Sequence, residues 1–200
     1  MDSKVQKCVL DYFICLENAY NTFKNTMSDC HKVTIKLFSL MERQKKLLKT
    51  NIIDTPLEKF DNIIELLTFQ INLQINLQLS ELQKHSQALH EIHQNLERKR
   101  ANLEKGCEEL DFKEKSSLMN GSAFQPRLSD LLEFSQDGVV FSLGVCAQIN
   151  YVIAAIMLNE NQCNSSFFLA ESFKLDDLTE KRVKEILMLT QFCNKNEIHS

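Results

Sequence analysis

Three histidines lie close together in the middle of the chain, and their spacing is the nearest that the sequence comes to a metal site. They are His85, His90 and His93. His90 and His93 are three residues apart, so a helix would place both imidazoles on one side, where they could share a metal ion. The segment His90-Glu91-Ile92-His93 is one residue too short for the H-E-x-x-H motif of zinc proteases, and no third ligand is evident. We interpret these side chains as polar positions on a helix face and predict no metal site.

The other side chains with chemical potential are scattered. Cys30 and His31 are neighbours in sequence and therefore point apart on a helix, so they do not form a thiolate–imidazole pair by themselves. The chain has four glycines, and they are not clustered into a phosphate-binding loop. The acidic pairs Glu108-Glu109 and Asp176-Asp177 are typical of surface and capping positions. We predict that the protein is not an enzyme, has no catalytic residues, and uses no cofactor or small-molecule substrate.

Cysteine usage and the first residues of the chain indicate a compartment. The seven cysteines are scattered and include no C-x-x-C pair, which favours reduced thiols over a zinc site or a disulfide framework. Near the start of the chain, Asp11 interrupts the apolar residues, so no secretory signal is predicted. Both observations predict a cytoplasmic or nuclear protein.

Composition predicts a folded protein with a core of its own. Of the 200 residues, 44% are hydrophobic and 25% are charged, as in ordinary globular proteins. The net charge of −4 argues against direct nucleic-acid binding, because a strongly basic face is the usual mark of such proteins. Basic runs occur at Arg43-Gln44-Lys45-Lys46 and Arg98-Lys99-Arg100, and solvated helix faces explain them.

A long helix is predicted from Phe60 to Leu110 and would carry the three histidines. This span contains no proline and a single glycine, Gly106. In its second half leucine recurs every seven residues, which forms a stripe that another helix must cover. The other seam position is not uniformly apolar, so packing against several helices is favoured over a two-stranded rod. The leucines of the stripe are Leu82, Leu89, Leu96, Leu103 and Leu110.

The first half of this helix contains a conflicting pattern. From Phe69 to Leu79 apolar and polar residues alternate strictly, which is the period of a β-strand. Turn residues that bound strands are missing on both sides, and leucine and glutamine are good helix formers, so we predict a helix. In a helix this alternation distributes apolar side chains around much of the circumference. It therefore predicts a segment that is covered from more than one direction.

The N-terminal region predicts a second long helix, from Val5 to Leu48, with no glycine or proline. Its apolar residues follow alternating steps of four and three, a heptad seam that only Thr34 interrupts. Because aromatic and sulfur-containing residues occupy the seam, an irregular intramolecular bundle is favoured over a coiled-coil dimer. Thr55 and Pro56 then mark the start of the next element. The seam comprises Val9, Phe13, Leu16, Tyr20, Phe23, Met27, Cys30, Leu37 and Met41.

The chain beyond residue 119 predicts a smaller helical part. Residues 120–126 are rich in turn formers and predict a linker between a long-helix bundle, residues 1–119, and C-terminal helices that pack on it, residues 127–200. A last helix is predicted, and Asp176, Asp177 or Thr179 is expected to cap its start. Its buried face is predicted to hold Val183, Ile186, Leu187 and Thr190.

One segment of this C-terminal part is unusually apolar. Between Val139 and Leu158 no residue is charged, and the mean hydropathy is about +2, which is enough for a membrane span. Gln148 and Asn150 lie near its middle, and polar side chains are costly in the centre of a bilayer. We predict a helix buried in the protein, with a membrane span as the alternative.

Four short segments, in the same order and at similar spacing over most of the chain, carry a family resemblance. They are Gln6-Lys7-Cys8, Met27-Ser28-Asp29-Cys30, Leu37-Phe38-Ser39-Leu40 and, above all, the stretch from Gln125 to Asp137. The chain resembles the AIRIM family of AAA-ATPase-interacting ribosome maturation factors. The resemblance implies a non-enzymatic all-α adaptor that joins a hexameric AAA-type ATPase, with a second small helical partner, in cytoplasmic maturation of the large ribosomal subunit. The uncharged stretch from Val139 to Leu158 departs from the basic, polar helix expected there.

We therefore predict an all-α, elongated helical bundle with two long N-terminal helical regions and a smaller C-terminal part. Lys99 and Arg100 fall where the second seam would need apolar residues, so we predict that the long helix is core up to about Ile92 and partner surface beyond it. The alternative is a membrane-associated helical tether anchored by Val139–Leu158. The predicted partner-binding residues are Leu96, Arg100, Leu103 and Leu110, while Leu82 and Leu89 are assigned to the core.

Overall fold

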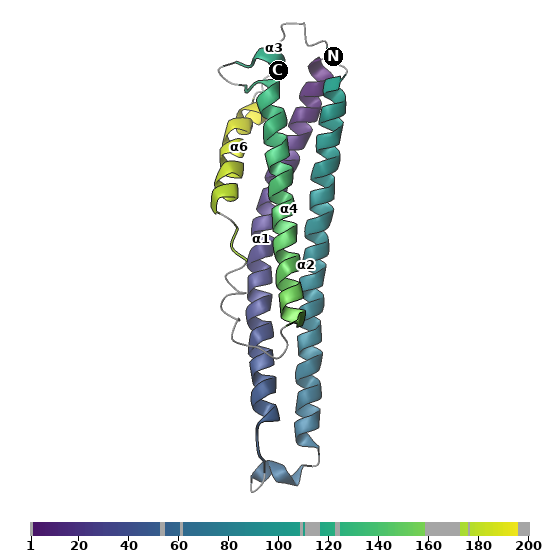
Figure 1. Ribbon diagram of the computed structural model, residues 1–200, viewed down its shortest axis with the longest axis vertical. Helices are drawn as coiled ribbons and strands as arrows, with labels where there is room; N and C mark the ends of the chain where they lie inside the picture. Colours follow the sequence, from purple (N-terminus) through teal and green to yellow (C-terminus); the bar gives the residue numbers. More distant parts are fainter. Residues whose placement is uncertain are drawn as a thin grey trace. The chain divides into compact units, whose positions relative to one another are not determined.

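The computed structural model describes residues 2–52, 55–60, 62–108, 110, 117–122, 125–158, 173–175 and 177–195 (Figure 1). Its helices are α1 (Asp2–Leu48), the 3-10 helix η1 (Pro56–Lys59), α2 (Ile63–Glu108), α3 (Ser117–Asn120), α4 (Leu128–Leu158) and α6 (Asp177–Lys195). Within these ranges no residue lies in a β-strand. The predicted all-α class is confirmed, with two long N-terminal helices and a smaller C-terminal part.

The chain divides into two compact units, and α1, α2 and α4 each contribute residues to both. Unit 1 contains the described residues of Met1–Asn25, Ala88–Ala147 and Leu175–Ser200. Unit 2 contains those of Thr26–Gln87 and Gln148–Lys174. The predicted linker at residues 120–126 and the domains on either side of it stay a prediction.

Unit 1 is assembled around the first half of α1. The Tyr12 hydroxyl donates a hydrogen bond to the Ser135 carbonyl oxygen of α4 at 2.6 Å. Further along α1, the Tyr20 hydroxyl donates a hydrogen bond to Glu180 Oε1 of α6 at 2.7 Å. Tyr12 is completely buried, so its hydrogen bond satisfies a hydroxyl that would otherwise be costly to desolvate. These tyrosines fix how α4 and α6 pack on α1.

The heptad positions of α1 are buried from its first turns to Met41. None of them is more than 7% exposed, and Thr34, the polar interruption, is 0% exposed. An apolar residue at every third or fourth position keeps one side of a helix continuously apolar, so that this side can be removed from water along its length. The apolar members are Val9, Phe13, Leu16, Tyr20, Phe23, Met27, Cys30, Leu37 and Met41.

The segment of α2 with strictly alternating polarity is helical, as predicted. The expectation that it is covered from more than one direction is wrong for the described residues, because Phe69, Leu73 and Leu77 are 63%, 44% and 53% exposed. In unit 2, α2 is linked to α1 by a hydrogen bond that the Gln44 side-chain amide of α1 donates to Asn72 Oδ1 of α2. The apolar side chains on the outer side remain in contact with solvent.

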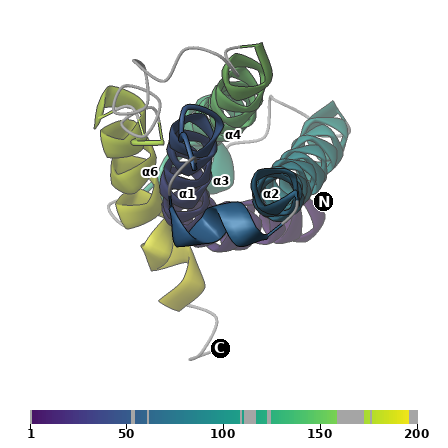
Figure 2. The ribbon, with the colours of Figure 1, turned by 90° about the horizontal axis from the view of Figure 1, so that it is seen from below.

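The connection between α1 and α2 contains η1, which Figure 2 shows crossing between the ends of the two helices. Thr55 Oγ1 accepts a hydrogen bond from the Leu57 backbone N–H at 3.3 Å, and Pro56 follows the capping residue. The predicted cap therefore begins the 3-10 helix and not α2. The long helix starts at Ile63, after Asn62, whose φ of 58° lies in the left-handed region that asparagine tolerates better than most residues.

The last helix, α6, begins at Asp177, within the segment that was predicted to cap it. Its predicted apolar face is buried, which confirms the pattern. The Thr190 hydroxyl, on the same face, donates to the Ile186 carbonyl oxygen at 2.9 Å and so carries no unsatisfied donor into the core. The exposed fractions are 1% for Val183, 0% for Ile186, 8% for Leu187 and 2% for Thr190.

Candidate partner surface

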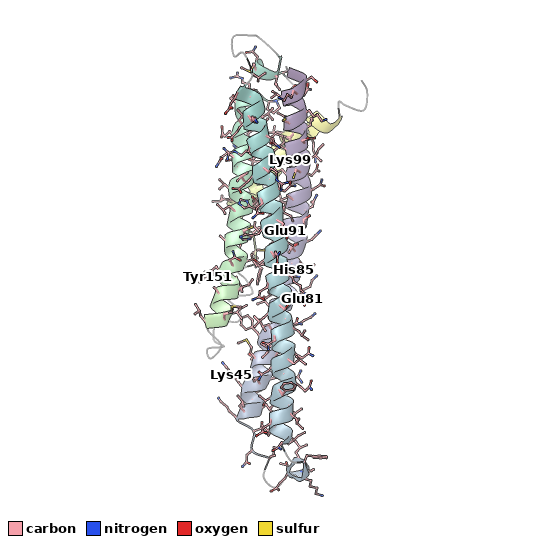
Figure 3. All side chains as sticks on the ribbon, turned by 90° about the vertical axis from the view of Figure 1, so that its right-hand side faces the viewer. Lys45, Glu81, His85, Glu91, Lys99 and Tyr151 are labelled. Carbon is pink, nitrogen blue, oxygen red and sulfur yellow. The ribbon has the colours of Figure 1, made fainter. Side chains whose placement is uncertain are left out.

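Of the three histidines of α2, His93 takes part in helix packing. His93 is 7% exposed, and its Nδ1 lies 2.7 Å from the Ser142 hydroxyl oxygen of α4. His90 and His85, the latter labelled in Figure 3, are half-buried on the same helix. Among the described residues no group of three or more His, Cys, Asp and Glu side chains is placed to hold a metal ion. The arrangement links α2 to α4 and offers no set of ligands.

Burial raises the pKa of four cysteines. Desolvation raises the pKa of Cys30 to about 12, with the charge of Asp29 as the next cause, and raises that of Cys146 to about 11. The pKa values of Cys15 and Cys107 are also raised, again chiefly by burial. A thiol with a raised pKa stays protonated near neutral pH and is a weak nucleophile. Cys30, Cys107 and Cys146 are buried and act as small apolar residues of the packing, while the Cys15 sulfur accepts a hydrogen bond from Asn95.

The leucine stripe of α2 lies inside the protein. The exposed fractions of Leu82, Leu89, Leu96 and Leu103 are all 0%. A completely buried side chain offers no apolar area to a partner, so this burial favours a core role for Leu96 and Leu103 over the partner role predicted for them.

The two remaining predicted partner residues are half-buried. Arg100 Nη2 lies 2.6 Å from Glu104 Oε1, one helical turn further along α2, so its guanidinium is engaged within the helix. Leu110 follows the end of α2 and is also half-buried. The partner role of these two residues stays a prediction.

An exposed apolar surface that the sequence analysis missed lies on α4. In unit 1, Val140 and Leu143 are 53% and 54% exposed. Gly144 and Ala147 are exposed beside them, and the spacing of the four residues places them on one side of the helix. In unit 2 the same helix exposes Tyr151, labelled in Figure 3, to 64%. We call the unit 1 set, Val140, Leu143, Gly144 and Ala147, the α4 face.

The opposite side of α4 fills the core of unit 1. Phe141 is 4% exposed, and its ring centroid lies 6.1 Å from that of Tyr20 and 5.9 Å from that of Phe23. Ser142, also buried, donates a hydrogen bond to the Val139 carbonyl oxygen at 2.8 Å. The helix is therefore apolar both on the side that packs and on the side that faces solvent. Exposed apolar patches of this kind mark protein or membrane interaction sites.

The length and composition of α4 are sufficient to cross a membrane. Its mean hydropathy is 2.0 over the most apolar 18-residue window, and half of that window is buried inside the protein. In unit 2 the polar residues of the helix find protein partners: Ser86 Oγ donates to Asn150 Oδ1 at 2.7 Å, and Gln148 Nε2 donates to the Lys174 carbonyl oxygen at 2.8 Å. The polar side chains that argue against a lipid environment thus form hydrogen bonds to other residues of unit 2.

We expect carbonate at high pH to release the native protein completely from cellular membranes. Insertion of α4 would break the contacts of its buried side with the rest of the bundle, and apolar burial is the main stabilising force of the fold. The measurement is the distribution of the protein between pellet and supernatant. A carbonate-resistant fraction that Leu143→Lys moves to the supernatant would contradict this expectation and identify lipid as the cover of the α4 face.

Comparison with known protein families shows which family this chain belongs to. Residues 3–192 match the protein family described as ribosome biogenesis protein C1orf109-like. The chain belongs to this family. The C1orf109-like match runs from α1 into α6 and includes the α4 face, and it confirms the resemblance to ribosome maturation factors found in the sequence.

A curated relative of this C1orf109-like chain comes from Danio rerio and is named AFG2-interacting ribosome maturation factor. It is 27% identical over 129 residues, which cover 62% of this chain and 62% of the relative. The matched segment thus spans a little under two thirds of either protein.

Proposed function

We propose that this chain is a non-enzymatic helical adaptor in maturation of the large ribosomal subunit, where it binds a hexameric AAA-type ATPase and a second small helical subunit. The α4 face carries the proposal, because it is an apolar, uncharged helix surface left exposed in a member of a ribosome biogenesis family. The name of the Danio rerio relative supports the ATPase as partner, since that protein is described as AFG2-interacting. A cytoplasmic or nuclear location follows from the same role.

The open backbone and the exposed side chains of the α4 face support a helix as the partner element. Apart from the neighbouring backbone of α4 itself, no atom of the described residues lies within 4 Å of the position that a Cβ would take at Gly144, so a second helix can approach the α4 backbone closely there. Val140 and Leu143 flank this opening and supply apolar anchors. Anchors of this kind usually dominate the energy of an interface. Docking of an apolar helix would also bury the exposed apolar side chains of the α4 face, which is favourable because it removes them from water.

Affinity purification of the tagged chain, followed by mass spectrometry, tests the proposal. We expect an AAA-type ATPase to co-purify with the wild-type chain, and Leu143→Lys to reduce its recovery by roughly tenfold or more, because a charge would be buried in an apolar contact. Met188→Lys is the matched control, since Met188 is an exposed apolar residue on α6 (68% exposed). Both variants should unfold at the temperature of the wild-type chain. Equal recovery of the ATPase with both variants would contradict the assignment of the α4 face.

A further inference from the structure

A second surface lies in unit 2, where α1 and α2 run beside each other and leave an open groove of about 460 Å³. The groove is formed by residues from the end of α1 and from the start of α2. Its apolar lining is only partly covered, and Leu67 is 42% exposed. We call it the basic groove; its principal lining residues are Leu40, Arg43, Lys46, Leu47, Leu67 and Ile71.

The charge of this groove has one sign. Arg43 and Lys46 are its charged lining residues, one turn apart on α1, and no acidic side chain lines it. No described residue forms an ion pair with either side chain. The surrounding part of α1 is strongly basic although the chain as a whole has a net charge of −4: residues 31–48 contain five Lys and Arg and one acidic residue, a formal charge of +4 with His31 neutral. The groove therefore presents positive charge that the described part of the chain does not neutralise.

The combination of leucines and cations favours a helical protein segment as occupant. An amphipathic helix binds a groove through apolar side chains at every third or fourth position, and its flanking residues reach the rim. Leu40, Leu47 and Leu67 offer apolar contacts, and the cations stand within the same groove. Single-stranded nucleic acid is usually held by aromatic stacking together with positive charge, and no aromatic side chain lines this groove. The chemistry fits an acidic helix better than it fits RNA.

We propose that the basic groove binds an acidic amphipathic helix of a partner protein. The leucine or isoleucine side chains of that helix would contact Leu40, Leu47 and Leu67, and its Asp or Glu residues would pair with Arg43 and Lys46. Opposite charges on groove and ligand would also speed association and disfavour basic ligands. This site lies in unit 2 and is distinct from the α4 face, so it does not rest on the proposed ATPase contact.

The probe is a synthetic, fluorescently labelled 18-residue peptide with leucine at helical spacing and glutamate at the flanking positions. A second peptide carries lysine in place of each glutamate. Fluorescence polarisation with the full chain at physiological salt is expected to show binding of the acidic peptide and at least roughly tenfold weaker binding of the basic one. The affinity of the acidic peptide should fall as salt is raised, because salt screens exposed charge pairs.

Matched variants test the charged and the apolar lining residues of the basic groove separately. Arg43→Glu/Lys46→Glu is expected to weaken the acidic peptide by roughly tenfold or more, while Lys36→Glu/Lys49→Glu, which makes the same charge change outside the groove, leaves most of the affinity. Leu67→Gln should weaken binding, and its neighbour Leu66→Gln should not, since Leu66 is 59% exposed and does not line the groove. These positions are exposed or half-buried, so the variants should fold, as thermal unfolding will verify.

Three results would overturn the proposal. The first is equal affinity for the acidic and basic peptides. The second is binding of a single-stranded RNA oligomer that depends on Arg43 and Lys46 but not on Leu67, which would make the groove a nucleic-acid surface. The third is a dimer, detected by sedimentation and abolished by Leu67→Gln, which would make a second copy of the chain the occupant.

Discussion

Replacing Leu96 and Leu103 together with alanine is expected to destabilise the isolated protein as severely as replacing Leu82 and Leu89. All four side chains are 0% exposed, and each Leu→Ala change in a packed core costs about 2–5 kcal/mol. Either pair therefore removes about 4–10 kcal/mol, which is comparable with the entire stability of an ordinary domain. Thermal and urea unfolding of the two double variants will measure the loss.

The control for this experiment is Leu66→Ala/Leu73→Ala, which removes two leucines from the solvent-exposed side of α2, where they are 59% and 44% exposed. It should change the unfolding temperature little. Co-purification of the ATPase with the folded fraction of each variant decides between core and partner roles. A Leu96→Ala/Leu103→Ala protein as stable as the wild type, but without the ATPase, would support the partner surface predicted at Leu96 to Leu110.

The structure explains why the second half of α2 looked like a partner surface. Its second seam is polar because neighbouring helices in unit 1 supply polar partners for it. His93 faces the Ser142 hydroxyl of α4, and Lys99 Nζ, on a residue labelled in Figure 3, lies 3.7 Å from Asp11 Oδ2 of α1. Because positions of this seam face two different helices, they do not all have to be apolar. The spacing of the leucines predicted the helix and its stripe, but it contains no information on which polar residues oppose the gaps.

The spacing of apolar residues was sufficient to predict the buried sides of α1 and α6, but it was insufficient to predict the exposed side of α4. The buried face of α6 and the burial pattern of α1 follow from steps of three and four, because polar residues mark the side that faces water. Between Val139 and Leu158 no charged residue marks that side, so the pattern predicts burial and leaves the outward direction undetermined. The small residues Gly144 and Ala147, spaced three apart next to Val140 and Leu143, are a signal in the sequence that was not used to predict an approachable side. Only the packing of Phe141 against α1 shows which side is covered.

Replacing Gly138 with alanine is expected to destabilise the protein, whereas Gly144→Ala is expected to stabilise it. A Cβ at Gly138 would lie 2.6 Å from the Tyr12 hydroxyl oxygen and 2.9 Å from Leu16 Cδ1, closer than side chains pack. Tyr12 is completely buried and bonded to Ser135, so it has no free space to retreat into. Forcing a methyl group into such a site costs about 1–3 kcal/mol.

Both glycines lie inside α4, so alanine gains up to about 1 kcal/mol of helix propensity at either position, and the difference between the two variants isolates the packing at Gly138. Urea unfolding is the measurement. Tyr12→Phe tests the cause, because removing the hydroxyl relieves the closest contact: the double variant Tyr12→Phe/Gly138→Ala should be more stable than the sum of the two single changes predicts. If Gly138→Ala is as stable as Gly144→Ala, α4 does not approach α1 as closely as the structure shows.

The Gly144→Ala protein also separates stability from binding, since its added methyl group lies on the α4 face. If a partner helix approaches there, this more stable protein should bind the ATPase less well.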